Sequence, residues 1–254
     1  MGVDMLVPSL KGKVSDEEWE MRVNLAACYQ LVAHYGMSDL IFTHISARVP
    51  GTENHFLINP YGLFFDEITA SSLIKVDIDG NIQQETPFKI NPAGYTIHSA
   101  IHAARHDLHC VLHTHTTAGM AVAAQKHGLL PISQHSMMFY GRLAYHGYEG
   151  IALDLDERER LVRDMGDNIA MILRNHGLLT VGTTVPEAFR RIFYLEKSCE
   201  SQVKAMAGDA ELIIPSREVC EHAASQFKIS ASQSGLEWPG LLRILDRKGS
   251  HYRD

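Results

Sequence analysis

The chain has 254 residues, of which 45% are hydrophobic and 21% are charged. This composition is ordinary for a globular protein, and the length allows a sizeable buried core. A formal net charge of -7 argues against nucleic acid as the main partner, and no apolar run is long enough to span a bilayer. The first twenty residues lack the apolar core of a signal peptide, and no Cys-x-x-Cys pair occurs. We therefore expect a cytoplasmic protein with reduced thiols and no membrane partner.

The first third of the chain alternates between helix and strand signals. Ser15, followed by three acidic residues, predicts a helix that ends near Gly36. The segments 39–50 and 55–60 have the residue types of strands. The run Asp79-Gly80-Asn81, which lies between β-type residues, predicts a hairpin.

The rest of the chain continues this alternation. We expect a turn at 91–94, a helix at 95–107, a strand at 110–116 and a helix at 117–128. The later elements are a helix at 155–166, strands at 170–177 and 178–182, and a helix from 184 to 206. The pattern indicates one α/β domain over residues 1–254. We expect the polar tail from about residue 230 to be loose, although Trp238 indicates that part of it docks.

The stretch 105–119 reads RHDLHCVLHTHTTAG and contains a His-x-His pair, His113 and His115. Alternate residues of a strand point to the same face, so both imidazoles face the same way, together with Val111. Two neutral imidazoles on a rigid strand suit one divalent ion. The alternative is that the pair only makes hydrogen bonds in a half-polar cleft.

His176 is the best candidate for a third ligand. It follows an apolar run, and Gly177 behind it allows close approach of the backbone. The alternative is an ordinary turn at 175–177. His98 and His102 form a rival pair, since i and i+4 on a helix is also a metal spacing. This pair lacks the acid of a His-Glu-x-x-His motif, and we expect the two histidines to face the core or to support the site.

Four motifs in a fixed order are similar to those of a known family. They are HCVLHTH, GLLPIS, AYHGYEGI and ILRNHGLLTVG, and NPYGLFFDEITASSLIKVD matches the first half of the same pattern. Together they resemble the class II aldolase and adducin family, especially the head domain of adducin and its bacterial relatives. The resemblance covers residues 17 to 210, and the ordered set is more specific than any single motif.

The resemblance implies a three-layer αβα sandwich around a central, largely antiparallel sheet. It also implies a metal ion held by His113, His115 and His176, most often Zn²⁺, with Fe²⁺ or Mn²⁺ as alternatives. Family enzymes are usually homotetramers with active sites at subunit interfaces. They act on small hydroxy-carbonyl compounds, often sugar phosphates, and the ion stabilises an enediolate.

The sequence departs from the aldolase pattern at three places. The turn that usually carries two serines and an acid reads Pro92-Ala93-Gly94. The early phosphate-binding element reads Thr43-His44-Ile45-Ser46, so only Ser46 is retained. The tyrosine that a neighbouring subunit supplies falls at His135. Because phosphate ligands and the usual acid–base group are missing, we expect negligible activity on sugar phosphates.

Three functions remain open on this evidence. A metal-dependent lyase of aldolase or decarboxylase type, acting on a small carbonyl or carboxylate compound through an enolate, is the main prediction. The alternatives are a non-haem iron oxygenase of an aromatic acid and a non-catalytic, adducin-like scaffold. The predicted catalytic residues are His135, Tyr140 and His98. The predicted substrate-binding residues are Ser46, His44, Gln134 and Gly94, while Arg48 and Arg174 either bind an anion or serve as structural cations.

Overall fold

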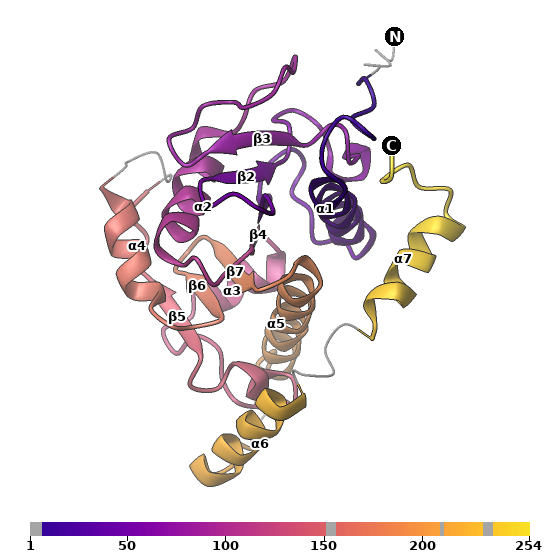
Figure 1. Cartoon of the computed structure of the whole chain (residues 1–254). Helices are drawn as coiled ribbons and strands as arrows, with labels where there is room; N and C mark the ends of the chain where they lie inside the picture. Colours follow the sequence, from indigo (N-terminus) through magenta and orange to yellow (C-terminus); the bar gives the residue numbers. More distant parts are fainter. Residues whose placement is uncertain (1–6, 151–155, 209–210, 231–235) are drawn as a thin grey trace.

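The computed structural model describes residues 7–150, 156–208, 211–230 and 236–254. A single sheet lies between two layers of helices (Figure 1). Its strand order is β3-β2-β1-β4-β7-β6-β5, and every neighbouring pair is antiparallel except β5 with β6. The strands are β1 His44–Arg48, β2 His55–Ile58, β3 Ile74–Asp77, β4 Cys110–Thr114, β5 Leu143–His146, β6 Ala170–Leu173 and β7 Gly177–Gly182. The predicted sandwich with a largely antiparallel sheet is confirmed.

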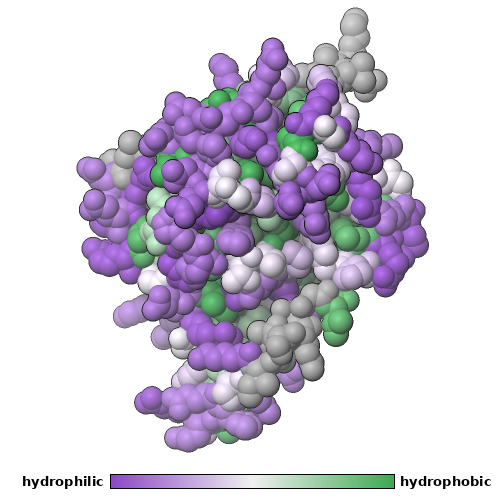
Figure 2. All heavy atoms as spheres, in the orientation of Figure 1, coloured by the Kyte–Doolittle hydropathy of each residue, from purple (hydrophilic) through white to green (hydrophobic). Residues whose placement is uncertain are grey.

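The helices cover both faces of the sheet (Figure 1). They are α1 Asp16–His34, α2 Pro92–Ala104, α3 Thr117–Ala123, α4 Glu157–Met165, α5 Val185–Ala205, α6 Arg217–Ser230 and α7 Trp238–Arg247, with short 3₁₀ helices η1 Phe65–Glu67 and η2 Ser136–Phe139. Leu112 belongs to the core that α1 and α5 bury, whereas Val111 belongs to the core under α2 and α4. Alternate side chains of β4 therefore pack into two separate cores, one on each face of the sheet. The outer face seen in Figure 2 is mainly hydrophilic, with small scattered apolar groups.

Two predicted helix starts are confirmed by their caps. The Ser15 side chain accepts a hydrogen bond from the Glu18 amide at 3.2 Å, and the Thr184 side chain accepts one from the Glu187 amide at 3.3 Å. Each cap satisfies one of the amides that a helix start leaves without an intrahelical partner.

Several elements differ from the sequence expectation, and three of them lie before β4. The strand expected at 39–50 shrinks to β1, because Leu40 and Thr43 have φ values of 49° and 66° and so turn the chain out of an extended path. The hairpin expected at Asp79 is reduced to one bridge beyond β3. Helix α2 begins at Pro92, where a turn was expected, so Gly94 lies in its first turn.

The C-terminal tail is docked over its described part. Trp238, at the start of α7, is 7% exposed, and its indole N–H donates to the Asn24 side chain at 2.9 Å. Tyr252 is fully buried, and its carbonyl accepts a hydrogen bond from the Ala70 amide at 3.0 Å. Residues 236–254 are therefore docked rather than loose, as Trp238 indicated for part of the tail, because an apolar stripe of α7 packs against α1. Residues 231–235 lie outside the described part.

Candidate metal centre

Two neighbouring strands deliver the three histidines predicted as ligands. His113 is in β4, His115 follows that strand directly, and His176 lies in the turn between β6 and β7. The antiparallel pairing of β4 with β7 brings this turn beside the end of β4. Gly177 is required there, since a Cβ atom at this position would collide with the Thr114 carbonyl oxygen. The turn at 175–177 therefore exists, and it also carries the third histidine to the other two.

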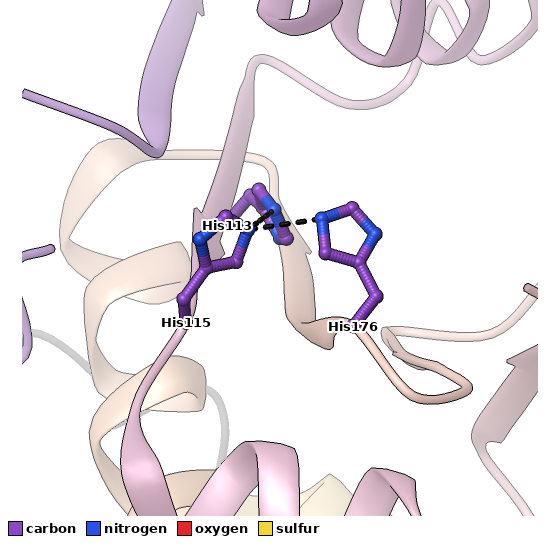
Figure 3. Close-up of side chains that lie close together, drawn as sticks. All are labelled: His113, His115 and His176. Carbon is purple, nitrogen blue, oxygen red and sulfur yellow. Dashed lines mark hydrogen bonds between the residues drawn. The ribbon is translucent and has the colours of Figure 1, made fainter. Parts of the chain in front are cut away.

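The three imidazoles converge through their Nε2 atoms (Figure 3). The Nε2 atom of His115 lies 2.9 Å from that of His113 and 2.9 Å from that of His176. All three candidate ligand atoms lie within 4.8 Å of one another. Within the described ranges, no other three His, Cys, Asp or Glu side chains meet this closely.

Partners behind the rings determine which nitrogen carries the proton. The Nδ1 atom of His113 lies 2.9 Å from the Leu178 carbonyl oxygen, and that of His115 lies 2.9 Å from a carboxylate oxygen of Asp39. Both oxygens only accept hydrogen bonds, so each Nδ1 donates and each Nε2 keeps a free lone pair. Backbone or carboxylate partners of this kind orient histidines that bind metal ions.

The electrostatics favour neutral ligands. Burial, reinforced by neighbouring histidines, lowers the pKa of His113 well below its ordinary value. Burial also lowers the pKa of His176, to about 4. Lone pairs that face each other without a proton between them repel, and a cation at their centre removes this repulsion. Tetrahedral zinc bonds of about 2.0–2.1 Å place ligand nitrogens about 3.3 Å apart, close to the separations seen here. The residues therefore fit a divalent ion.

Asp39 is a side chain at this centre that the sequence did not reveal. Its side chain is 40% exposed and it reaches His115 across 76 positions of the chain. The left-handed backbone of Leu40 and Thr43 turns this segment toward the end of β4. Asp39 is the only acid between Gly36 and β1, but nothing local distinguishes it from a turn residue.

A second histidine cluster lies behind the first. His44 and Ser46 are on β1, and His98 and His102 on α2 contact them. The Nδ1 atom of His44 is 2.7 Å from Nε2 of His98, whose Nδ1 is 2.5 Å from the Ser46 hydroxyl. The same hydroxyl is 2.7 Å from Nε2 of His102. The row on α2 thus faces the core, as we expected of it.

The two clusters meet at one cross-strand pair. His44 on β1 is opposite His113 on β4, and their ring centroids are 5.1 Å apart. His98 is fully buried behind His44. The prediction of His98 as a catalytic residue stays a prediction, and its contacts with His44 and Ser46 fit a role in positioning His44.

The other predicted site residues lie elsewhere in the chain. Gln134 and His135 are exposed beside η2, and the His135 ring is 4.7 Å from that of Tyr194 on α5. Tyr140 ends η2 and is half-buried. Among the described residues, no hydrogen bond or ring contact joins these three to the histidine centre.

Both predicted cations are already engaged within the fold. The Arg48 guanidinium donates to the His102 and Glu53 carbonyl oxygens. Arg174 donates to the Gln125 carbonyl oxygen at 2.7 Å and stacks over a tyrosine ring. These contacts support the structural alternative for both side chains.

The fold and this histidine centre define a class that comparisons with known proteins also identify. Residues 23–203 match the family model described as "Class II Aldolase and Adducin N-terminal domain", and the chain belongs to this family. An aldolase II superfamily protein from Pseudomonas syringae is 58% identical, with a TM-score of 0.93 over 97% of this chain and 100% of that one.

Two further relatives are named as an aldolase and as an adducin. An L-fuculose 1-phosphate aldolase from Glaciozyma antarctica is 30% identical, with a TM-score of 0.81 over 94% of this chain and 93% of that one. Alpha-adducin of Rattus norvegicus is 41% identical over 90% of this chain, which spans 33% of that protein. No described helix has both the length and the apolar character that a membrane crossing needs.

Proposed function

We propose that this protein is a metal-dependent lyase that acts on a small carbonyl or carboxylate compound through an enolate. The observation that carries the proposal is the convergence of three imidazoles, two of which, His113 and His115, have partners that leave an Nε2 lone pair directed at the common centre. A divalent ion held there, most often zinc, supplies Lewis-acid stabilisation of the enolate charge. His113 and His115 are held in the ligating tautomer by their partners, and burial keeps His113 and His176 neutral.

The residues expected to contact the substrate differ from those of a sugar-phosphate aldolase. Residue 94 carries no carboxylate, and the only hydroxyl retained in the early element, Ser46, is fully buried and bound to two histidines. Because Ser46 is buried and engaged by two histidines, it does not present its hydroxyl to a phosphate group. We therefore propose a carboxylic acid with a neighbouring carbonyl as the substrate, and negligible turnover of sugar phosphates.

An activity panel tests this function. The protein, loaded with zinc, is offered sugar phosphates, β-hydroxy acids and β-keto acids, and the products are followed by NMR. We expect cleavage or decarboxylation of an acid and none of a sugar phosphate. The same panel, run anaerobically with Fe²⁺ and then oxygen on aromatic acids, tests the oxygenase alternative. Absence of activity on every compound, with metal bound, favours the non-catalytic scaffold that the adducin relationship keeps open.

We also propose a homo-oligomer, of tetramer type, in the cytoplasm. Ile213, Ile214 and Val219, in or just before α6, are 89%, 53% and 55% exposed, and exposed apolar groups often mark an interface. His135 lies beside this region and away from its own histidine centre, which fits a site completed by a neighbour. The double change Ile213→Lys and Ile214→Lys should reduce the mass measured by light scattering, whereas Ile82→Lys, on the exposed far edge, should not.

A further inference from the structure

The space beside Gly94 is occupied by another side chain. Gly94 lies in the first turn of α2, and a Cβ atom added there would be 2.5 Å from Cδ2 and 3.1 Å from Nε2 of His44. Its backbone is not left-handed, so the contact with His44, rather than strain, excludes a side chain. The imidazole of His44 therefore fills the space that a side chain on residue 94 would enter.

The contacts of His44 leave one nitrogen for chemistry. Its Nδ1 atom is engaged by His98 at 2.7 Å, which leaves Nε2 on the side of Gly94. The ring centroid is 4.5 Å from that of His98 and 5.1 Å from that of His113. His44 therefore connects the buried cluster to the candidate ligands. A proton-transfer group needs this kind of placement, at the edge of the reacting centre and held by a second residue.

We infer that His44 is the acid–base residue of the reaction, in the place that a side chain on residue 94 would occupy. The inference rests on the proposed function. His98 is then a positioning residue, held by Ser46, which also binds His102. An imidazole is neutral or positive and never negative, so this substitution keeps a negative charge away from the ligands. It therefore suits a substrate that is itself an anion.

The chemistry balances without a further reactant. A proton on the carbon next to the substrate carbonyl passes to Nε2 of His44, the C–H electron pair becomes the C=C bond of the enolate, and the C=O π pair moves to the oxygen. Return of a proton from the same nitrogen to that carbon restores the substrate. In D₂O the returning particle is a deuteron, so enolate formation is visible as deuterium exchange even when no bond to carbon is cleaved.

The test measures this exchange by ¹H NMR with pyruvate and dihydroxyacetone as probes and zinc-loaded protein. We expect His44→Ala and His44→Gln to lower kcat about 10²–10⁴-fold, with KM and zinc content within about threefold of wild type. Added imidazole should restore exchange to H44A, which has the space for it, and not to H44Q. The exposed His127→Gln serves as the matched control and should behave as wild type.

A side-chain swap separates chemistry from packing. Gly94→Glu alone should impair exchange, because its Cβ atom collides with the His44 ring. The double variant H44A/G94E should exchange faster than either single variant, because a carboxylate then enters the vacated space. Zinc content, measured by elemental analysis, should be the same in all four proteins. A crystal structure of the double variant should place the carboxylate where the ring was.

The outcomes distinguish the two proposals. If the zinc-loaded wild type exchanges neither probe, the proposed function fails and the inference fails with it. If wild type exchanges and H44Q does so at a similar rate, the inference alone is overturned. Loss of zinc together with loss of exchange in both His44 variants would make His44 a structural residue and would also overturn it.

Discussion

Two histidine clusters meet where strands β1 and β4 pair, yet they are built in opposite ways. In the candidate metal centre, His113 and His115 direct their N–H groups outward, to a carbonyl and to Asp39, and their lone pairs inward. In the buried cluster, His98 and His102 share the Ser46 hydroxyl. The first arrangement leaves lone pairs pointing at a common centre, and the second connects the rings in a chain.

The difference shows that the partners of an imidazole, more than its burial, decide what it can do. His113 is 1% exposed and His98 is fully buried, and burial lowers the pKa of both well below the ordinary value. Partners that only accept hydrogen bonds free a lone pair for a metal ion. A hydroxyl, which both donates and accepts, can bind one nitrogen of each of two rings, and those two nitrogens are then engaged inside the cluster.

The largest expected effect comes from removing a converging nitrogen. His113→Asn should reduce bound zinc from about one ion per chain to almost none, because two ligands do not hold zinc tightly. Elemental analysis after dialysis measures this. The change His127→Asn, at an exposed histidine, should leave zinc content unchanged. A zinc-replete H113N protein would mean that the ion is held elsewhere.

A smaller loss of zinc binding is expected when Asp39, the partner of His115, is changed. Asp39→Asn keeps the shape but weakens the acceptor for His115, and the affinity for zinc should fall about 10–100-fold. Competition with a chromophoric chelator gives the dissociation constant. Asp66→Asn, at an exposed acid in η1, is the matched control. An unchanged affinity in D39N would show that the contact of Asp39 with His115 does not support the metal site.

The buried cluster should respond in stability and not in metal binding. Ser46→Ala leaves one nitrogen on each of two buried histidines without a partner, at a cost of about 3 kcal/mol in the free energy of unfolding. Urea denaturation measures the loss, and zinc content should stay near one ion per chain. If S46A instead lost zinc at unchanged stability, the two clusters would not be independent.

The smallest effect is a dependence of stability on pH. Burial, aided by Arg48, lowers the pKa of His102 from 6.5 to about 3. The unfolded chain therefore takes up this proton first, so stability is highest above pH 6.5 and declines as the pH falls toward 3. At pH 5 the loss is about 2 kcal/mol. In urea titrations at pH 7.5 and pH 5, His102→Leu should flatten this decline, and an equal decline in H102L would assign it to other groups.

Local sequence patterns predicted much of this architecture. The two-residue period around His113 and His115 placed both on one face, and their Nε2 atoms are 2.9 Å apart. Periods and caps are properties of neighbouring residues, so the chain shows them directly. The family motifs pointed to His176, although it lies 61 positions from His115.

Other features depended on contacts that no local pattern encodes. By itself, the sequence determined most of the strands and helices and the common face of His113 and His115, because backbone periodicity and capping act over a few residues. Only the tertiary structure placed Asp39 behind His115, moved His98 behind His44 and filled the space beside Gly94 with the His44 ring. These arrangements arise where β1, β4 and α2 pack together, and side chains far apart in the chain then compete for the same volume.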